Sequence, residues 1–249
     1  MRCLPGIVWV LASGCPLLAQ TAPEPLPAFD VASITPSQMA RRGGEGSGRE
    51  HISWTPKSLT LENASLTAAI QWAYEVKFYQ TSGPAWASGD RWDVAARNQN
   101  PASPERLRLM LRQLLASRFR LALHREAKLL SVFELRPDHG GPKFQAAKAG
   151  ETTDLRVVNG QFVLQGMPVA AFAEWLSELA VVARPVLDRT GIHGTFDFTL
   201  PAIRYPAPEG VDPDWIFTAL REQLGLALKP AKAPVEVLVI DRADRPSPN

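Results

Sequence analysis

Cysteine is scarce in this 249-residue chain, which has only two, and both lie near the start as Cys3 and Cys15. The segment that contains them has the pattern of a removable leader, so we expect the remaining chain to be free of cysteine. Such a chain has no disulfide, no thiolate metal site and no cysteine nucleophile. A core of this size can fold without such cross-links.

Recognisable catalytic motifs are also missing. The sequence contains no His-Glu-x-x-His, no Gly-x-Ser-x-Gly, no phosphate-binding loop and no dinucleotide fingerprint. Its four histidines are scattered, and only His124 has a metal-type neighbour, Glu126, at a spacing that shares one strand face. No third ligand accompanies that pair, which we interpret as an exposed charge pair. We therefore expect no metal, no cofactor and no enzyme.

A strong charge of one sign is absent as well. The formal net charge is +2, and loss of Arg2 with a leader would lower it to +1 (26 − 25). Without a global positive field, nucleic acid is excluded as a partner. Arginines do cluster locally along 106–120, which we interpret as a solvated helix face that leaves room for an acidic partner.

The N-terminus predicts export. Residues 1–19 combine one arginine, a short apolar run and an Ala19–Gln20 cleavage site, as a signal peptide does. Two alternatives stay open: an uncleaved membrane anchor, and a lipoprotein attached through Cys15. The apolar run is shorter than the roughly 20 residues that span a bilayer, and no later segment could span one. The predicted location is periplasmic or extracellular.

Two stretches of the chain resemble each other. Residues 58–72 and 161–175 each begin with the alternation of a strand, pass through a polar turn and continue as an apolar helical stripe. Each stripe ends at a tryptophan, and the two tryptophans lie 103 positions apart (175 − 72). Further on, Ser103-Pro104 and Asp212-Pro213 each predict a helix start, 109 positions apart (213 − 104). The pattern predicts an α+β fold made by duplication of a unit of about 90 residues, with the order β-β-α-β-β-α-β-β.

We expect the following organisation: signal peptide 1–19, N-terminal strand and glycine-rich loop 20–49, first repeat 50–137, linker 138–153, second repeat 154–244 and tail 245–249. Each repeat is predicted to end in a hairpin, at 120–135 and at 226–240. Asn159-Gly160 predicts a tight type I′ hairpin turn. The repeats could form two abutting lobes or share one pseudo-symmetric sheet, and the pattern favours two lobes.

Four residues are candidates for a ligand site. Asp188, Arg189 and His193 share one short turn, where they could bind an anion or perform acid–base chemistry. The competing interpretation is structural: Asp188 caps the turn and its glycines adopt positive φ. Trp86 lies in the dissimilar loop 83–90, either exposed for stacking on a sugar or peptide or folded onto the core.

Several longer runs resemble a soil-associated bacterial family of exported proteins built on a domain of unknown function. The resemblance covers about 29–249 and rests on VLDRTGIHGTFDFTL at 186–200, LLASRF at 114–119, HRE at 124–126, PVEVLVID at 234–241 and FDVASI at 29–34. Some members of that family resemble fusions to a membrane metallopeptidase of the antibiotic-sensor type. The resemblance therefore implies an extracytoplasmic sensory role. The helix and hairpin order is also similar to the short N-terminal domains of secretins and TonB-dependent transducers, which are docking modules.

These observations predict an exported, non-enzymatic binding or docking module for an envelope protein or glycan. The basis is the small α+β unit with open hairpin edges, which can accept a partner strand. One alternative is an exported enzyme of unrecognised type, such as a hydrolase, that uses the 188–193 turn. The other is a structural envelope protein.

Overall fold

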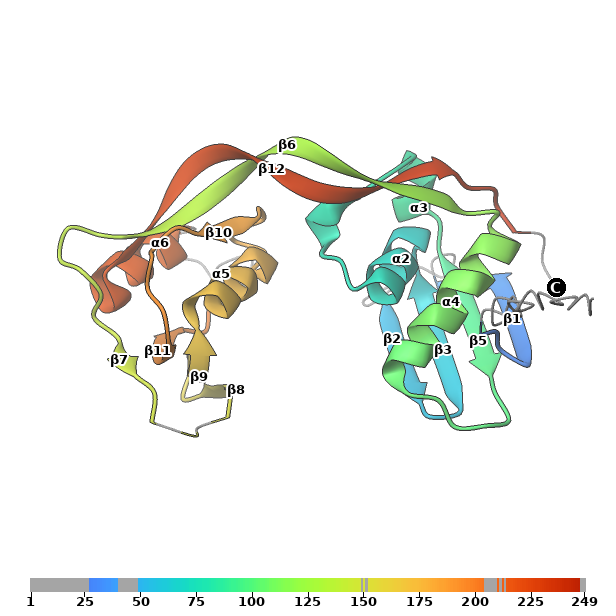
Figure 1. Ribbon diagram of the computed structural model, residues 1–249, viewed down its shortest axis with the longest axis horizontal. Coiled ribbons are helices and arrows are strands. Elements are labelled where there is room, and N and C mark those ends of the chain that lie inside the picture. Colours follow the sequence, from blue (N-terminus) through green and yellow to red (C-terminus); the bar gives the residue numbers. More distant parts are fainter. Residues whose placement is uncertain are drawn as a thin grey trace, which may run out of the picture.

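Two lobes joined by a long two-stranded ribbon make up the molecule (Figure 1). The computed structural model describes residues 27–39, 49–148, 150, 152–203, 210, 212 and 214–246. The expected signal peptide and most of the glycine-rich loop at 40–50 lie outside these residues. Among the helices that are described, none is both long and apolar enough to cross a membrane.

The first lobe is a four-stranded antiparallel sheet covered by helices. Its strand order is β1 (Val31–Pro36), β5 (Trp92–Arg97), β3 (Ser58–Ala64) and β2 (His51–Thr55). The buried faces of α2 and α4 pack on this sheet around Leu59, Leu61 and Val94. The alternating apolar residues of the strands and the periodic apolar residues of the helices therefore pack in one core, as the sequence pattern predicts.

Serine side chains begin both of these helices. Helix α2 (Leu66–Tyr74) starts after Ser65, whose Oγ accepts a hydrogen bond from the Ala68 amide at 3.1 Å. Helix α4 (Pro104–Arg118) starts after Ser103, whose Oγ accepts from the Arg106 amide. Each bond satisfies an amide that the first helical turn leaves unpaired. The sequence predicts Ser103 as a cap, which is confirmed, and offers Asn63 or Ser65 for α2, of which Ser65 is the cap. The apolar face of α4 is buried.

The second lobe has a similar arrangement, in which only the second helix is shorter. Its sheet order is β7 (Gln145–Ala146), β11 (Thr195–Pro201), β9 (Gln161–Pro168) and β8 (Asp154–Val158). Helix α5 (Val169–Glu178) packs on it, followed by α6 (Trp215–Ala219) and a π-helical turn (Leu220–Leu224). Helix α6 begins two residues later than predicted, because Asp212 accepts from the Asp214 amide in a separate turn.

The predicted terminal hairpins are wrong. Residues 120–135 and 226–240 belong instead to two uninterrupted strands, β6 (Ala122–Pro137) and β12 (Leu226–Arg242). The two strands pair with each other, antiparallel, from Leu226 opposite Pro137 to Arg242 opposite Ala122. No glycine, asparagine or aspartate interrupts 125–130 or 229–235. Pro230 and Pro234 lie in the part of β12 that does not pair with β4, where proline is tolerated, so each strand runs on and finds its partner far away in sequence.

The ribbon also carries a sheet that both lobes share, with the order β10-β6-β12-β4. Strand β10 (Val186–Asp188) lies parallel to β6, and β4 (Thr81–Ser82) lies parallel to β12. Each short strand therefore pairs with the long strand contributed by the other half of the sequence. The α+β class is confirmed, and the molecule combines two lobes with a shared sheet.

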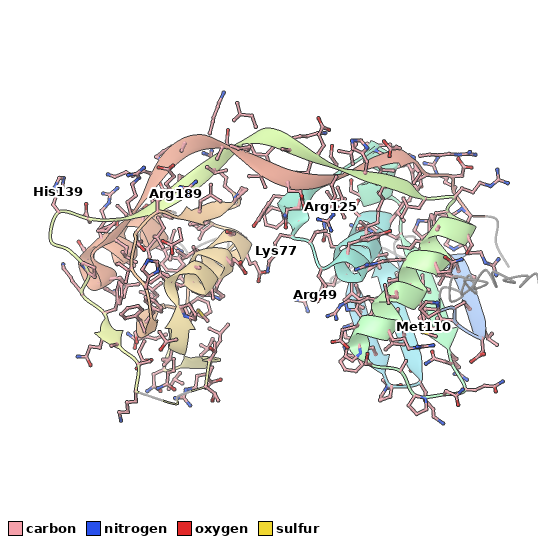
Figure 2. All side chains as sticks on the ribbon, in the orientation of Figure 1. Arg49, Lys77, Met110, Arg125, His139 and Arg189 are labelled. Atoms are coloured by element: carbon pink, nitrogen blue, oxygen red, sulfur yellow. The ribbon has the colours of Figure 1, made fainter. Side chains whose placement is uncertain are left out.

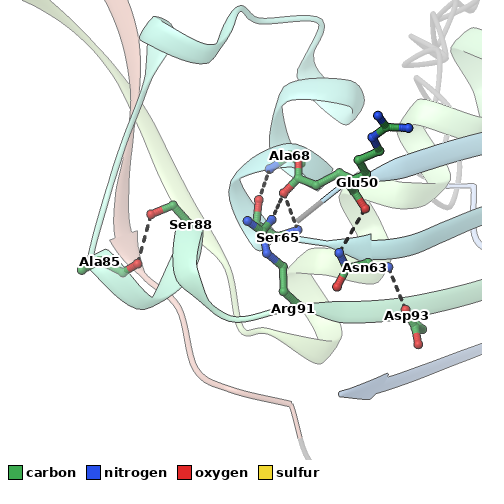
Figure 3. A network of polar contacts seen from close by, with 9 residues as sticks. Glu50, Asn63, Ser65, Ala68, Ala85, Ser88, Arg91 and Asp93 are labelled. Atoms are coloured by element: carbon green, nitrogen blue, oxygen red, sulfur yellow. Dashed lines mark hydrogen bonds and ion pairs between the residues drawn. The ribbon is translucent and has the colours of Figure 1, made fainter. Parts of the chain in front are cut away.

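A matching irregularity occurs in the two lobe sheets. In β3, Asn63 has φ 52° and its amide donates to Asp93 Oδ1 at 2.8 Å (Figure 3). In β9, Gly166 has φ 59° and its amide donates to Asp197 Oδ1 at 2.9 Å. Strand register shifts beside both bonds, as at a β-bulge. The correspondence supports the predicted duplication, which itself remains a prediction.

Candidate functional site

The turn that follows β10 is closed by its own hydrogen bonds. Asp188 Oδ1 accepts from the amide and the hydroxyl of Thr190, at 2.8 and 2.7 Å. Glycines at both ends of the loop have positive φ, 68° at Gly191 and 114° at Gly194. The Asp188 carboxylate thus stabilises the turn by hydrogen bonding, as the structural interpretation requires.

Arg189 and His193 do not join that carboxylate in a pocket. The Arg189 side chain is 55% exposed, and its nearest acidic partner is Glu134 at 3.9 Å (Figure 2). The His193 side chain is exposed. The hydrolase hypothesis requires these groups to converge, and the described contacts show no such convergence.

Trp86 lies in the other lobe. It belongs not to a loop, as predicted, but to the short helix α3 (Ala85–Gly89), and it packs against the first-lobe core. The Arg245 guanidinium covers its ring at 5.0 Å and is held there by Asp90 at 2.6 Å. The four predicted site residues are therefore divided between the lobes, and Trp86 is capped by the chain's own C-terminal segment.

His124 is engaged by the ribbon. Its Nδ1 lies 2.7 Å from Asp241 Oδ1 on the neighbouring strand, and its Nε2 lies 3.8 Å from Glu126. No group of three or more histidine, cysteine, aspartate or glutamate side chains suited to a metal occurs in the described part of the chain. The structure accounts for His124 as a cross-strand charge partner.

A larger cavity lies between the lobes. It has a volume of about 670 Å³, and both lobes line it; we call it the inter-lobe groove. Its lining residues are Glu50, Ile52, Ala68, Gln71, Trp72, Glu75, Val76, Lys77, Arg108, Glu174 and Glu178. Helices α2 and α5, which begin at corresponding positions of the two predicted repeats, form much of its walls.

Trp72 and Arg108 form part of the first-lobe wall. The Arg108 guanidinium lies over the Trp72 ring at 5.5 Å and contacts Glu75 at 3.3 Å. Glu75 ends α2 in a left-handed conformation, with φ 55°. Arg112, one turn further along α4, donates to the carbonyl of Ala73 at 2.7 Å. Because Arg108 and Arg112 are turned onto α2, the expectation of a solvated arginine face is wrong for these two.

Glu50 is the groove carboxylate that lies beside the start of α2. Its Oε1 accepts from the Ser65 amide at 3.0 Å and from the Arg91 guanidinium (Figure 3). The same carboxylate therefore accepts from an amide at the start of α2 and pairs with Arg91, the residue that precedes β5. This bonding orients Glu50 and reduces its freedom to bind a ligand.

Helix α5 supplies the second-lobe wall. Lys77 bridges the groove to Glu178, and the hydrogen bond between them raises the pKa of the Lys77 ammonium (Figure 2). Tyr79 follows two residues later, and burial raises the pKa of its phenol. The sequence pattern placed Lys77 on the apolar stripe of the preceding helix. That helix ends at Tyr74, which frees Lys77 to reach across.

Glu174 differs from the other groove carboxylates. It is exposed on α5, and no hydrogen bond or ion pair within 4 Å joins it to another described residue. Four carboxylates and two cations line the groove together with the Trp72 ring. None of these groups is paired as nucleophile and base within the described lining.

Two smaller cavities each belong to one lobe. One of about 400 Å³ lies over the first-lobe sheet at Ser33, Thr60 and Ala95. The other, of about 340 Å³, lies beside Lys143 and Thr199 in the second lobe. Neither contacts both lobes, which distinguishes them from the inter-lobe groove.

Comparison with known proteins identifies a family and no characterised relative. No curated protein and no solved structure matches the chain. A family profile described as "Protein of unknown function (DUF3738)" matches residues 67–243, from α2 to the end of the ribbon. The match confirms the resemblance to a family built on a domain of unknown function. It covers the second lobe and the part of the first lobe from α2 onward. The chain therefore belongs to the DUF3738 family of proteins of unknown function.

Proposed function

We propose that this chain is an exported, non-enzymatic binding or docking module whose ligand sits in the inter-lobe groove. Export is supported by the leader pattern of residues 1–19. Binding is supported by the groove and by the absence of a converging catalytic set among the described residues. The proposed partner is an envelope protein or glycan.

The observation that carries the proposal is that both lobes line one cavity. Its volume of about 670 Å³ falls within the roughly 300–1,000 Å³ typical of ligand sites. Beneath the ribbon, the lobes are tied through the ion pair between Lys77 and Glu178. A ligand in the groove would contact both walls and hold the lobes in one relative position. That coupling suits a role in envelope sensing.

The charges of the groove favour a partner that carries cations. Carboxylates outnumber cations four to two, and Glu174 has no described partner. A protein segment with lysine or arginine would pair with Glu174 and could stack against the Trp72 wall. An anionic glycan would meet the excess of negative charge. The proposal therefore prefers a basic protein segment over an acidic polymer.

Retention of envelope components by the immobilised chain tests this proposal. We expect the wild-type chain to retain a partner from solubilised envelope fractions, and Glu174→Arg to lose most of that retention because it reverses the one unpaired groove charge. Glu222→Arg is the matched control, since it makes the same change on an exposed side chain outside the groove. Equal retention by all three proteins, or none by wild type, contradicts the groove as the binding site.

A further inference from the structure

Strand β8 is an open edge of the second-lobe sheet. It pairs with β9 on one side and is the last strand in the order β7-β11-β9-β8. All five of its residues are exposed. Its outer side thus offers backbone groups that no described strand pairs, and such an edge is a template for another chain.

The hairpin turn determines which backbone groups point outward. Asn159 and Gly160 have φ of 51° and 72°, as a two-residue type I′ turn requires. Val158 and Gln161 flank the turn as a directly opposed, hydrogen-bonded pair. Because hydrogen-bonding sides alternate along a strand, Val157 and Leu155 direct their N–H and C=O groups away from β9.

The side chains of these same two residues extend the core beyond the edge. Leu155 lies opposite the buried Leu164, and Val157 lies opposite Phe162, whose ring packs on Trp175 at 5.1 Å. Leu155 and Val157 remain 47% and 61% exposed, since no helix covers the sheet at its edge. An added strand would bury both against an apolar face that already exists.

The opposite face of β8 carries one charge of each sign. Asp154 and Arg156 alternate with the apolar residues and contact each other at 3.6 Å. Their side chains therefore point away from the core and would lie beside the side chains of an added strand. A partner strand with the complementary charge order would gain two cross-strand ion pairs.

Other edge strands in the described residues are less available. Strands β4, β7 and β10 have only two or three residues. Of the longer edge strands, β1 ends in Pro36 and its Ile34 is already buried in the first-lobe core. In β2, the corresponding apolar residue Ile52 also packs on that core. Strand β8 also lacks the proline, bulge or inward-pointing charge by which edge strands usually avoid pairing.

We propose that the outer edge of β8 binds an extended segment of a partner polypeptide by antiparallel strand addition. The segment presents apolar side chains to Leu155 and Val157, a basic residue opposite Asp154 and an acidic residue opposite Arg156. This inference rests on the proposed function as a docking module, but it uses a surface separate from the inter-lobe groove.

The position of β8 in the molecule favours an extended segment over a folded second copy. In Figure 1, β8 lies on the side of the second lobe that faces β2 of the first. An added strand needs only the usual spacing of about 4.8 Å. A second copy would bring a whole sheet and its helices into the same region.

Two synthetic peptides of identical composition test the proposal. Thr-Val-Glu-Val-Lys-Thr places Glu opposite Arg156 and Lys opposite Asp154 in an antiparallel pair, whereas Thr-Val-Lys-Val-Glu-Thr opposes like charges. We expect the first peptide to bind the wild-type chain roughly three- to tenfold more tightly, measured by fluorescence anisotropy of labelled peptides. Equal affinity, preference for the second peptide, or no binding of either overturns the proposal.

Two variants make the test independent of folding artefacts. Asp154→Arg combined with Arg156→Asp exchanges two exposed charges, so the preference between the peptides should reverse. Val157→Pro removes an outward N–H without removing a bond to β9, and should weaken the first peptide at least tenfold. An unchanged preference in the double variant overturns the charge register.

The outcome can be separated from that of the groove experiment. If Glu174→Arg abolishes retention of the envelope partner while wild type ignores both peptides, the groove proposal stands and strand addition fails. If peptides bind as expected while no envelope partner depends on Glu174, the reverse holds. If sedimentation shows a dimer that Arg156→Asp dissociates, a second copy occupies β8 and the partner-segment proposal is wrong.

Discussion

The first lobe stabilises its helices through their ends, whereas the second lobe stabilises them through aromatic packing. Ser65 and Ser103 cap the first-lobe helices, but α5 begins after Pro168 without a side-chain cap. In exchange, Phe172 of α5 stacks on Phe198 with centroids 4.2 Å apart, inside a larger group of aromatic rings. A cap contributes about 1 kcal/mol, while a buried aromatic contributes several. The same element order thus tolerates different sources of stability.

The turn from the second helix of each lobe into the ribbon shows a related difference. In the first lobe, Arg120 takes the left-handed conformation, with φ 49°. Its exposed guanidinium lies 3.7 Å from the Asp244 carboxylate. In the second lobe, Gly225 takes the left-handed conformation, with φ 63°. A Cβ at Gly225 would also lie 1.9 Å from the Gly141 carbonyl oxygen. The chain therefore needs glycine at one of these turns and merely tolerates arginine at the other.

The largest expected effect is removal of an aromatic ring from the second lobe. Phe198→Ala should lower the free energy of unfolding by about 3–5 kcal/mol, since the side chain is fully buried. Val94→Ala at the corresponding strand position of the first lobe should cost less, about 1–3 kcal/mol, because fewer buried atoms are lost. Denaturant unfolding measures both. Equal losses would contradict the contrast between the lobes.

Next comes the turn at Gly225. A Cβ there would lie 1.9 Å from the Gly141 carbonyl oxygen, and the backbone would be strained at φ 63°. Gly225→Ala should therefore lower stability by roughly 2–4 kcal/mol, measured by chemical denaturation. A loss below about 1 kcal/mol would show that the Gly141 segment moves away without cost.

The two bulges should respond alike. Asp93→Ala and Asp197→Ala each remove the acceptor of a bulge amide, at Asn63 and Gly166. Each should cost about 1–3 kcal/mol and speed exchange of that amide with solvent. Hydrogen exchange followed residue by residue checks this, and a response in only one lobe would contradict their structural equivalence.

The smallest expected effect has the opposite sign. Arg120→Gly should stabilise the chain by about 0.5–1 kcal/mol, because glycine adopts positive φ without the Cβ penalty. The exposed ion pair with Asp244 offsets little of this gain. Thermal unfolding of Arg120→Gly and wild type measures the difference. A destabilised variant would mean that the arginine stem or ion pair contributes more than its exposure indicates.

Prediction from sequence worked where neighbouring residues determine the conformation. Ser65, Ser103 and the Asn159-Gly160 turn were identified because caps and tight turns depend on residues only a few positions apart. It failed at β6 and β12, where we inferred a turn inside each alternating pattern although neither predicted turn contains glycine, asparagine or aspartate. Their pairing joins residues up to 120 positions apart (242 − 122), which no local pattern reveals.

The candidate site was predicted less well than the fold. The 188–193 turn was noticed because it combines aspartate, arginine and histidine, yet Asp188 hydrogen-bonds within its own turn. The groove was missed because its carboxylates occur as ordinary exposed residues of separate elements. The available signal was the pair of corresponding helices ending near Trp72 and Trp175, but periodicity does not say which helix faces which.

By itself, the sequence determined the alternation of strands and helices, the start of α4, the tight hairpin turn and the α+β class, because each depends on short-range backbone and side-chain preferences. Tertiary structure alone decided that the long strands pair across the two halves, that Lys77 reaches Glu178, and that β8 is left as an open edge. These features depend on contacts between distant segments, whose free energy appears only when the whole chain has folded.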